Sequence, residues 1–254
     1  MTDKPDSPLA RSFIRSPNFG DRRDGRRPDI LLLHYTGMES ADAALDWLVN
    51  PQSSVSCHYL VDEAGVITQM VAEDKRAWHA GASCWAGETD INSSSIGIEI
   101  HNPGHDFEYP PFPEAQMQAV EALCLDILGR HDIPARRVLA HSDVAPERKI
   151  DPGEKFDWKR LAEAGAGLWV PPGPPGSGEG LGPGSGGGAV KALQEKLRAY
   201  GYEVEATGEY DDRTYVTVAA FQRHFRPDRI DGIADLSTVA TLDKLLDKIA
   251  TPVG

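Results

Sequence analysis

The sequence has no uninterrupted apolar run close to the roughly 18 residues that a membrane-spanning helix needs. It is also short of basic residues, since 26 Lys and Arg stand against 39 Asp and Glu, which gives a formal net charge of −13. This sign of charge disfavours binding to a phosphate backbone, which depends on cationic side chains. We therefore expect neither a membrane nor a nucleic acid as a partner.

Cysteine is scarce as well, with Cys57, Cys84 and Cys124 as the three examples. Their number is odd and none is part of a CxxC pair, so no disulfide framework is expected and a reducing compartment is favoured. Residues 1–29 lack the apolar core and the small-residue cleavage site of a secretory signal. These observations predict a cytoplasmic protein, with a periplasmic location as the alternative.

The composition is typical of a folded globular protein, because 40% of the 254 residues are hydrophobic and 26% are charged. Gly and Pro total 44, and 14 of them fall within residues 171–188. Because this segment has so few side chains to bury in a core, its composition predicts a linker. The predicted division is an N-terminal extension at 1–28, a large domain at 29–170, the linker at 171–188 and a small domain at 189–254.

The large domain mixes strand and helix patterns. Predicted strands are 29–34, a hairpin at 57–70 that turns at 63–65, 95–100 and 138–141. A short helix at 40–49 is expected to bury Ala44, Trp47 and Leu48, and a long helix follows Pro113. This alternation predicts an α/β fold, a mixed β-sheet flanked by helices.

The small domain shows helical periodicity throughout. Its recurring apolar residues are Val190, Leu193, Leu197 and Tyr200, then Val218, Phe221 and Phe225, then Leu242, Leu245 and Ile249. Gly201 is placed to end the first helix, and Asp211 and Ser237 are placed to cap the second and third. His224 is expected at the surface or its boundary. The prediction is a small three-helix bundle without a catalytic centre.

Two buried strands of the large domain each end in a histidine, His34 and His141, and Asp151 follows ten residues after His141. Two imidazole nitrogens and one carboxylate oxygen would leave a fourth tetrahedral position open, which is the pattern of a catalytic zinc site. Such a site predicts metal-assisted hydrolysis. Each histidine taken alone also fits a hydrogen-bonded structural role.

Glu99 and Lys149 complete the predicted chemistry. Glu99 interrupts an apolar strand on the face opposite Ile98 and Ile100, where it can serve as the general base. Lys149 would place a positive charge near a developing oxyanion. The structural alternatives are a solvated sheet face for Glu99 and a loop ion pair between Lys149 and Asp151.

Several segments together carry a resemblance to a known family. They are SPNFGDRR (16–23), LLLHYTG (31–37), CHYLVDEAG (57–65), RAWHAG (76–81), NSSSIGIEIHNPG (92–104), YPPFPEAQ (109–116) and HSDVAPERKIDPG (141–153). This pattern, from about residue 14 to 165, resembles the N-acetylmuramoyl-L-alanine amidases, the type-2 zinc amidases. Residues 190–246 resemble the three-helix peptidoglycan-binding module of wall hydrolases.

The resemblance implies hydrolysis of the amide bond that joins the muramic lactyl group to L-alanine of the stem peptide. It assigns the zinc ligands to His34, His141 and Asp151, the catalytic glutamate to Glu99 and the oxyanion-stabilising lysine to Lys149. An aspartate at position 151 resembles the AmpD branch. The implied partners are muropeptides or peptidoglycan fragments.

The resemblance also places His58, His79, Trp78, Trp85 and Asn92 in segments that line the family's cleft, as substrate-binding candidates. Both tryptophans fit core packing equally well.

Two positions depart from the family pattern. Cys57 stands where phage and animal members have a tyrosine, and Asp90 stands where some recycling amidases have an arginine that grips a peptide carboxylate. A phenol at position 57 and that carboxylate contact are therefore not expected here.

Three roles remain open at the level of sequence. The first is cytoplasmic recycling of anhydromuropeptides, indicated by the missing signal and by Asp151. The second is an exported amidase that remodels intact peptidoglycan, indicated by the C-terminal module, which would add a second site on the same polymer. The third is a non-catalytic muropeptide sensor, which would need an incomplete ligand set. The module could also only pack against the catalytic domain.

Overall fold

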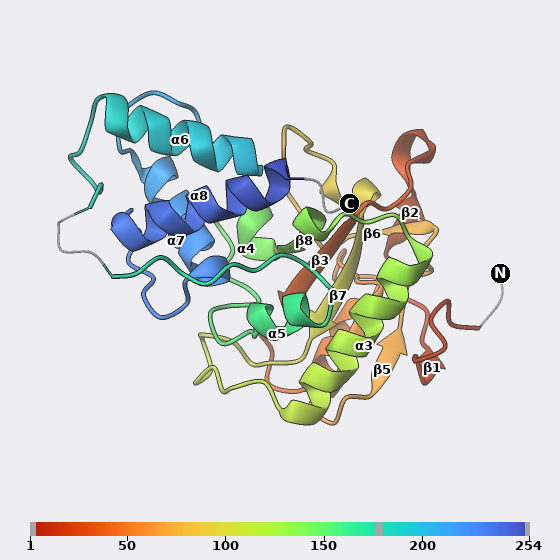
Figure 1. The fold of residues 1–254 in the computed structure, drawn as a ribbon. Coiled ribbons are helices and arrows are strands. Elements are labelled where there is room, and N and C mark those ends of the chain that lie inside the picture. Colours follow the sequence, from red (N-terminus) through yellow and green to blue (C-terminus); the bar gives the residue numbers. More distant parts are fainter. Residues whose placement is uncertain (1–3, 176–179, 252–254) are drawn as a thin grey trace.

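A six-stranded mixed sheet forms the centre of the N-terminal part in this computed structural model, which describes residues 4–175 and 180–251 (Figure 1). The order across the sheet is β1-β5-β4-β7-β3-β8. The strands are β1 (Ser12–Phe13), β3 (Ile30–Tyr35), β4 (Tyr59–Val61), β5 (Ile67–Gln69), β7 (Ser95–Ile100) and β8 (Val138–Ala140). A separate antiparallel pair joins β2 (Phe19–Asp21) to β6 (Lys75–Ala77). The predicted mixed sheet is confirmed.

Helices flank this sheet, and three helices are the main regular elements of the C-terminal residues that the structure describes. The helices are α1 (Ala41–Leu48), α2 (Ile91–Ser94), α3 (Glu114–Arg130), α4 (His141–Val144), α5 (Trp158–Glu163), α6 (Gly188–Tyr200), α7 (Asp212–Phe225) and α8 (Leu236–Ala250). Two short 3-10 helices lie at Arg23–Gly25 and Ala135–Arg137. The C-terminal helical region is therefore confirmed. The short helices α2, α4 and α5 and the strands β1, β2 and β6 have too little periodicity to be predicted from sequence.

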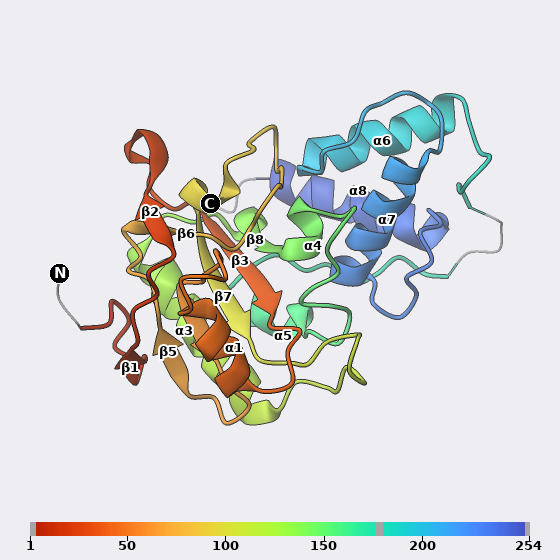
Figure 2. The ribbon, with the colours of Figure 1, turned by 180° about the vertical axis from the view of Figure 1, so that it is seen from behind.

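The alternation of side chains along β3 decides where its histidine lies. Leu31 and Leu33 pack into the apolar core beneath α3, whereas Ile30 and Leu32 belong to the core on the other face. Because alternate residues of a strand share a face, His34 lies with Ile30 and Leu32, opposite α3. The two views show α3 on one face of the sheet and α1 on the other (Figures 1 and 2).

Helix α1 follows the predicted boundaries but not the predicted burial. Ser40 accepts a hydrogen bond from Ala43 N at 3.1 Å and so caps the helix. Ala44 and Leu48 are buried as expected, but the Trp47 side chain is 48% exposed. The prediction that Trp47 is buried is wrong, because the ring projects beside the cavity described below.

The hairpin turn also lies where it was predicted. Gly65 has φ +80°, and a Cβ built there would lie 2.6 Å from the Ala115 carbonyl oxygen. Positive φ and this close approach of the backbone at the start of α3 both require glycine.

The C-terminal helices confirm two predicted ends and correct a third. Gly201 ends α6 with φ +143°, and Asp211 caps α7 by accepting from Thr214 N at 2.8 Å. The N-cap of α8 is Asp235 rather than Ser237, which lies inside the first turn. His224 is 2% exposed, so its prediction as a surface or boundary side chain is wrong.

The C-terminal helices share one apolar core with the sheet domain. Ile30 and Trp85 belong to the same buried cluster as residues of α6, α7 and α8, and the Trp85 ring meets those of Tyr200 and Tyr202 edge-on. Figure 1 shows these helices lying against α4 at the β8 side of the sheet. The module therefore packs on the domain that precedes it.

The segment at 171–188 makes specific contacts with α8 and its preceding loop. Gly173 N donates to Thr241 Oγ1 at 2.9 Å, and Leu181 forms an isolated bridge with Ala234. Part of the predicted linker, 176–179, lies outside the described residues. The predicted division into four segments stays a prediction.

Within residues 4–175 and 180–251, none of the helices combines the length and apolar character needed to cross a bilayer.

Candidate active site

The site lies at the carboxyl ends of three neighbouring parallel strands. His34 is the fifth residue of β3 and pairs in register with Glu99 of β7. His141 begins α4 directly after β8, which pairs with β3 on its other side. Because parallel strands end at the same edge, their last side chains meet there, which is where open α/β sheets bind ligands.

Asp151 reaches the same place from the loop that follows α4. Its carbonyl oxygen accepts from Ser142 N at 3.0 Å, which ties the loop back to the residue after His141. The next residue, Pro152, is held by Tyr109, whose hydroxyl donates to the Pro152 carbonyl at 2.8 Å.

Three side-chain atoms converge in this cluster. His34 Nδ1 lies 2.9 Å from His141 Nδ1 and 3.2 Å from Asp151 Oδ2, and His141 Nδ1 lies 3.0 Å from Asp151 Oδ2. Ligand atoms about 2.0 Å from a tetrahedral zinc ion are separated by about 3.3 Å. The observed triangle therefore has the size of one face of a tetrahedral zinc site.

Hydrogen bonds behind His34 fix which of its nitrogens carries a proton. Ser95 Oγ donates to Ile91 O at 2.6 Å, so it accepts from His79 Nε2, 3.2 Å away. His79 Nδ1 is then an acceptor for His34 Nε2–H at 2.9 Å. The chain of donors leaves His34 Nδ1 with a free lone pair that points into the cluster.

His141 is held from behind in a similar way. Its Nε2 lies 3.1 Å from the Ala80 carbonyl oxygen, which can only accept, so in the neutral ring His141 Nδ1 carries the lone pair. Together with the carboxylate of Asp151, the cluster presents three acceptors to one point. Such a donor set fits a cation, and it is consistent with the zinc site of type-2 amidases.

The ionisation of these groups favours metal binding. Burial and the neighbouring His141 lower the pKa of His34 to about 4, so its ring is neutral at pH 7. Burial alone would raise the pKa of Asp151, but positive charge on the adjacent histidines, which a bound cation would replace, holds the pKa of that carboxyl far below its usual range. Neutral imidazoles and an ionised carboxylate are the forms that bind metals.

Glu99 lies beside this cluster with part of its carboxylate unpaired. Glu99 Oε2 is buried and has no hydrogen-bond partner among the described residues. Burial first, and then the charge of Asp151, raise the pKa of Glu99 well above its ordinary value, while Lys149 opposes the shift. A raised pKa makes this carboxyl group a better proton acceptor than an ordinary glutamate, as a general base needs.

A cavity of about 520 Å³ opens over the cluster and Glu99. Lys149 lines it, held by a backbone hydrogen bond from Lys149 N to Ala145 O at 3.0 Å. Other residues that line the cavity were not among the predicted site residues; they include Tyr35, Met38, Trp47, Val55, Asp106, Arg148 and Ile150. Trp47 carried a detectable signal, an aromatic residue on a short surface helix, but helical periodicity assigned it to the core.

The structure separates the five predicted substrate-binding residues into two groups. Trp78 and His79 line the cavity. His58, Trp85 and Asn92 lie outside its lining. Asn92 instead supports the wall, since its Oδ1 accepts from His79 N at 3.0 Å and Ala80 N at 2.8 Å.

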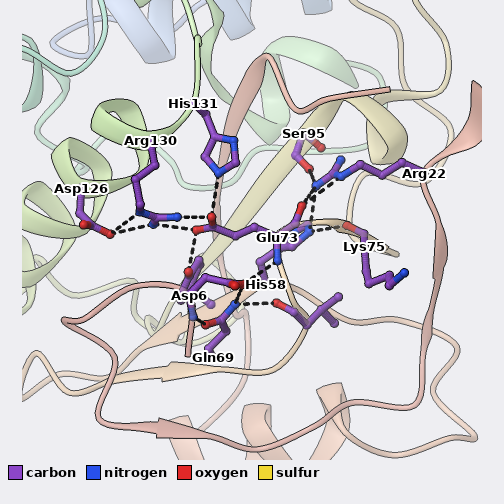
Figure 3. Close-up of polar contacts among 12 residues, drawn as sticks. Asp6, Arg22, His58, Gln69, Glu73, Lys75, Ser95, Asp126, Arg130 and His131 are labelled. Carbon is purple, nitrogen blue, oxygen red and sulfur yellow. Dashed lines mark hydrogen bonds and ion pairs between the residues drawn. The ribbon is translucent and has the colours of Figure 1, made fainter. Parts of the chain in front are cut away.

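Trp85 is enclosed by the C-terminal helices and is 2% exposed, which is the burial that its core-packing alternative expects. His58 is fully buried as well. Its Nδ1 accepts from Gly97 N at 3.0 Å, and its Nε2 faces Lys75 O and Arg22 in the polar network of Figure 3. Burial, with Arg22, lowers the pKa of His58 to about 3, so it is a neutral structural side chain.

Cys57 and Asp90, the two residues that depart from the family pattern, lie outside the cavity lining. Cys57 Sγ lies within 4.8 Å of donor nitrogens of His34 and His79, behind the cluster, and burial raises the pKa of its thiol. Asp90 pairs with Arg76 at 2.9 Å and lies outside the cavity. The Cys57 thiol therefore cannot replace the phenol, and the Asp90 carboxylate cannot replace the arginine, that the family pattern has at these positions.

A mixed sheet whose cavity joins a cation-binding donor cluster to an unpaired glutamate defines a hydrolase site. Residues 24–154 match the family described as N-acetylmuramoyl-L-alanine amidase, and residues 186–242 match a peptidoglycan binding domain. The chain belongs to the N-acetylmuramoyl-L-alanine amidase family, whose enzymes hydrolyse the amide bond between the lactyl group of N-acetylmuramic acid and L-alanine.

Similar proteins span the chain to different extents. The amidase AmiD of Escherichia coli K12 is 39% identical over 247 residues, 87% of this chain and 83% of AmiD. The 1,6-anhydro-N-acetylmuramyl-L-alanine amidase AmpD of Enterobacter cloacae is 31% identical over 165 residues, 58% of this chain and 86% of AmpD. The match to AmpD therefore leaves a larger share of this chain unaligned than the match to AmiD does.

Solved structures show the same likeness. AmiD of E. coli, in complex with the substrate anhydro-N-acetylmuramic acid-L-Ala-D-γ-Glu-L-Lys, has a TM-score of 0.75 with 37% identity, covering 89% of this chain and 91% of that one. AmpDh3 of Pseudomonas aeruginosa, in complex with an anhydromuramic pentapeptide, has a TM-score of 0.73 with 33% identity, covering 89% and 94%.

Proposed function

We propose that the enzyme uses one zinc ion, held by His34, His141 and Asp151, to hydrolyse anhydromuramyl peptides at the bond to L-alanine. The observation that carries this proposal is the convergence of three lone-pair donors, 2.9–3.2 Å apart, on one side of a cavity. Zinc bound there would polarise the substrate carbonyl and lower the pKa of water.

Glu99 would move the proton in this reaction. Its carboxylate takes a proton from the attacking water as the oxygen adds to the lactyl carbonyl carbon. It then gives that proton to the nitrogen of L-alanine as the C–N bond breaks, so a carboxylic acid and a free amine result, and the acid then passes its proton to the amine. The raised pKa of Glu99 and its unpaired oxygen suit both halves of this transfer.

Lys149 would act on the carbonyl oxygen. As that oxygen gains negative charge in the tetrahedral intermediate, an ammonium group at the cavity wall stabilises it. Trp78 and the exposed ring of Trp47 line the same cavity and offer apolar surface to the sugar or the stem peptide.

Anhydromuramyl peptides are proposed as the substrates because both AmiD and AmpDh3 bind such compounds and resemble this chain over about nine-tenths of its length. The corresponding role is recycling of imported muropeptides in the cytoplasm. The close packing of the C-terminal helices on the catalytic domain agrees with a soluble substrate, since a tethered wall-binding module would not need a shared core.

A second candidate role is remodelling of intact peptidoglycan outside the cytoplasm. It is favoured by the match of residues 186–242 to a peptidoglycan binding domain and by the likeness to AmiD along both parts of the chain.

Product analysis by mass spectrometry tests the proposed function. We expect release of free stem peptide from an anhydromuramyl peptide, loss of this activity after dialysis against a chelator, and recovery on adding zinc. Full activity of the chelated, metal-free enzyme would overturn the zinc proposal. Equal turnover of intact sacculi, together with activity found outside the inner membrane on fractionation of native cells, would favour the second role.

A further inference from the structure

The metal ligand His141 lies on a helix that cannot hold its own position. Helix α4 is a single turn, His141–Val144, and at its C-terminal end Ala145 N donates to His141 O at 3.0 Å. Helix formation is cooperative and its first turn is unfavourable, so a one-turn helix is stable only when neighbouring structure fixes it. The contacts that α4 makes with other elements therefore decide where His141 points.

The strongest of these contacts is made by Asp143, two residues after His141. Its carboxylate is buried and accepts three hydrogen bonds, from Ala140 N at 2.8 Å, from His224 Nδ1 at 2.7 Å and from Tyr202 OH at 2.6 Å. An ionised carboxylate without such donors would be costly to bury. Two of the three donors come from the C-terminal module.

Both donors are themselves fixed in place. His224 belongs to α7, is 2% exposed and stacks on Trp158 of α5 with 3.8 Å between ring centroids. Tyr202 follows α6, is 1% exposed and meets the ring of Trp85 at 5.0 Å. Each donor is thus held between the module and the sheet domain, and neither can follow Asp143 if α4 moves.

We propose that His224 and Tyr202 are positioning residues of the zinc site, acting through Asp143 on His141. Helix α4 transmits the effect over a short path, because His141 is a ligand and the next residue, Ser142, binds the backbone of the ligand Asp151. In this view the C-terminal module is part of the catalytic centre's framework, whatever it binds. The inference rests on the proposed zinc site.

The chain offers a matched pair of variants for the test, Tyr202→Phe and Tyr210→Phe. Both tyrosines are buried, and both hydroxyls donate one hydrogen bond of 2.6 Å, Tyr202 to Asp143 and Tyr210 to the Gly232 carbonyl within the module. Each substitution removes one hydroxyl without changing the ring. Only the first of them loosens α4.

The measurements are the zinc affinity of the full chain by chelator competition and the visible spectrum of the cobalt-substituted form. We expect Tyr202→Phe to weaken zinc binding about tenfold and to change the cobalt spectrum, because partners that orient metal ligands affect affinity on this scale. Tyr210→Phe should leave both unchanged while lowering the melting temperature to a similar extent. Equal zinc affinities in the two variants would overturn the inference.

A second comparison uses His224 itself. The amide of His224→Asn can donate to Asp143 in place of Nδ1, whereas His224→Leu cannot. We expect His224→Asn to keep zinc affinity near that of the parent and His224→Leu to lose it. Equal zinc affinity in the two folded His224 variants would contradict the proposal. If His224→Leu does not fold, the comparison of Tyr202→Phe with Tyr210→Phe tests the proposal instead.

These results separate the inference from the proposed function. A parent chain that binds no zinc and hydrolyses muropeptides without it contradicts the proposed function. A parent chain that binds zinc as tightly as Tyr202→Phe contradicts the positioning role alone.

Discussion

Glu73, which is buried, and Glu99, which is half-buried, are two carboxylates of one domain with opposite surroundings. Glu73 lies in a polar network near the C-terminal end of α3, where Tyr59 OH donates to it at 2.6 Å and His131 Nε2 lies 2.7 Å away (Figure 3). Arg130 pairs with both of its oxygens. Glu99 has a buried oxygen with no partner among the described residues.

This difference in hydrogen-bond partners shifts the pKa values of the two carboxyl groups in opposite directions. Burial alone would raise the pKa of Glu73, but hydrogen bonds from His131, Arg130 and Tyr59 outweigh it and lower that pKa to about 2. Burial raises the pKa of Glu99, and the nearby charge of Asp151 adds to the rise. A satisfied buried carboxylate stabilises the fold, whereas an unsatisfied one at a cavity wall is available for proton transfer.

The largest effect is expected in the cavity, from Asp151→Ala. Removing the only carboxylate of the proposed ligand set should lower zinc affinity by more than about 100-fold and reduce amidase activity to background. Metal analysis of the purified variant, beside a turnover assay, measures both. Full zinc occupancy in this variant would show that Asp151 is not a ligand.

Glu99→Gln should separate zinc binding from turnover. The amide keeps the shape of the side chain but cannot take up a proton, so kcat should fall by about 10²–10⁴ while bound zinc is unchanged. The measurement is kcat together with zinc content. Turnover equal to that of the parent would remove Glu99 as the proton-transfer group.

Glu73→Gln tests the structural half of the comparison. The Glu73 carboxylate takes up a proton near pH 4.5 in the unfolded chain and only near pH 2 in the folded chain. Its contribution to the stability of the fold is therefore complete above pH 4.5 and disappears as the pH falls to about 2. The difference corresponds to about 3 kcal/mol. We expect denaturant unfolding at pH 7 to show a loss of this size, and unfolding near pH 2 to show almost none.

In the same variant, zinc affinity and kcat should be those of the parent. A loss of stability that stays constant from pH 7 to pH 2 would mean that the ionised carboxylate is not what stabilises this network.

Tyr59→Phe should have the smallest effect. It removes one of the hydrogen bonds to the Glu73 carboxylate, and such a bond to a charged group contributes about 2 kcal/mol. Stability measured by denaturant unfolding should fall by that amount, and amidase activity should not change. A drop in activity would instead mean that the network of Figure 3 is coupled to the cavity.

Local patterns in the sequence were enough for most of the regular structure. The hairpin turn at Gly65 and the cap at Asp211 lie where they were predicted, because both depend on the chemistry of a few neighbouring residues. Trp47 and His224 were placed wrongly, since periodicity assigns a face to a side chain but does not show what covers that face. Trp47 lines an open cavity, and His224 is covered by a second domain.

The sequence by itself determined the chemical inventory of this protein: two strand-ending histidines, an acidic residue in an apolar strand and a proline-punctuated loop with a carboxylate. Tertiary structure alone decided that His34 and His141, 107 positions apart, bring their Nδ1 atoms within 2.9 Å of each other. It also decided that His224 and Tyr202 of the C-terminal part bond to Asp143, two residues after His141. The physical reason is that distances between remote residues follow from strand pairing and packing, which no short segment encodes.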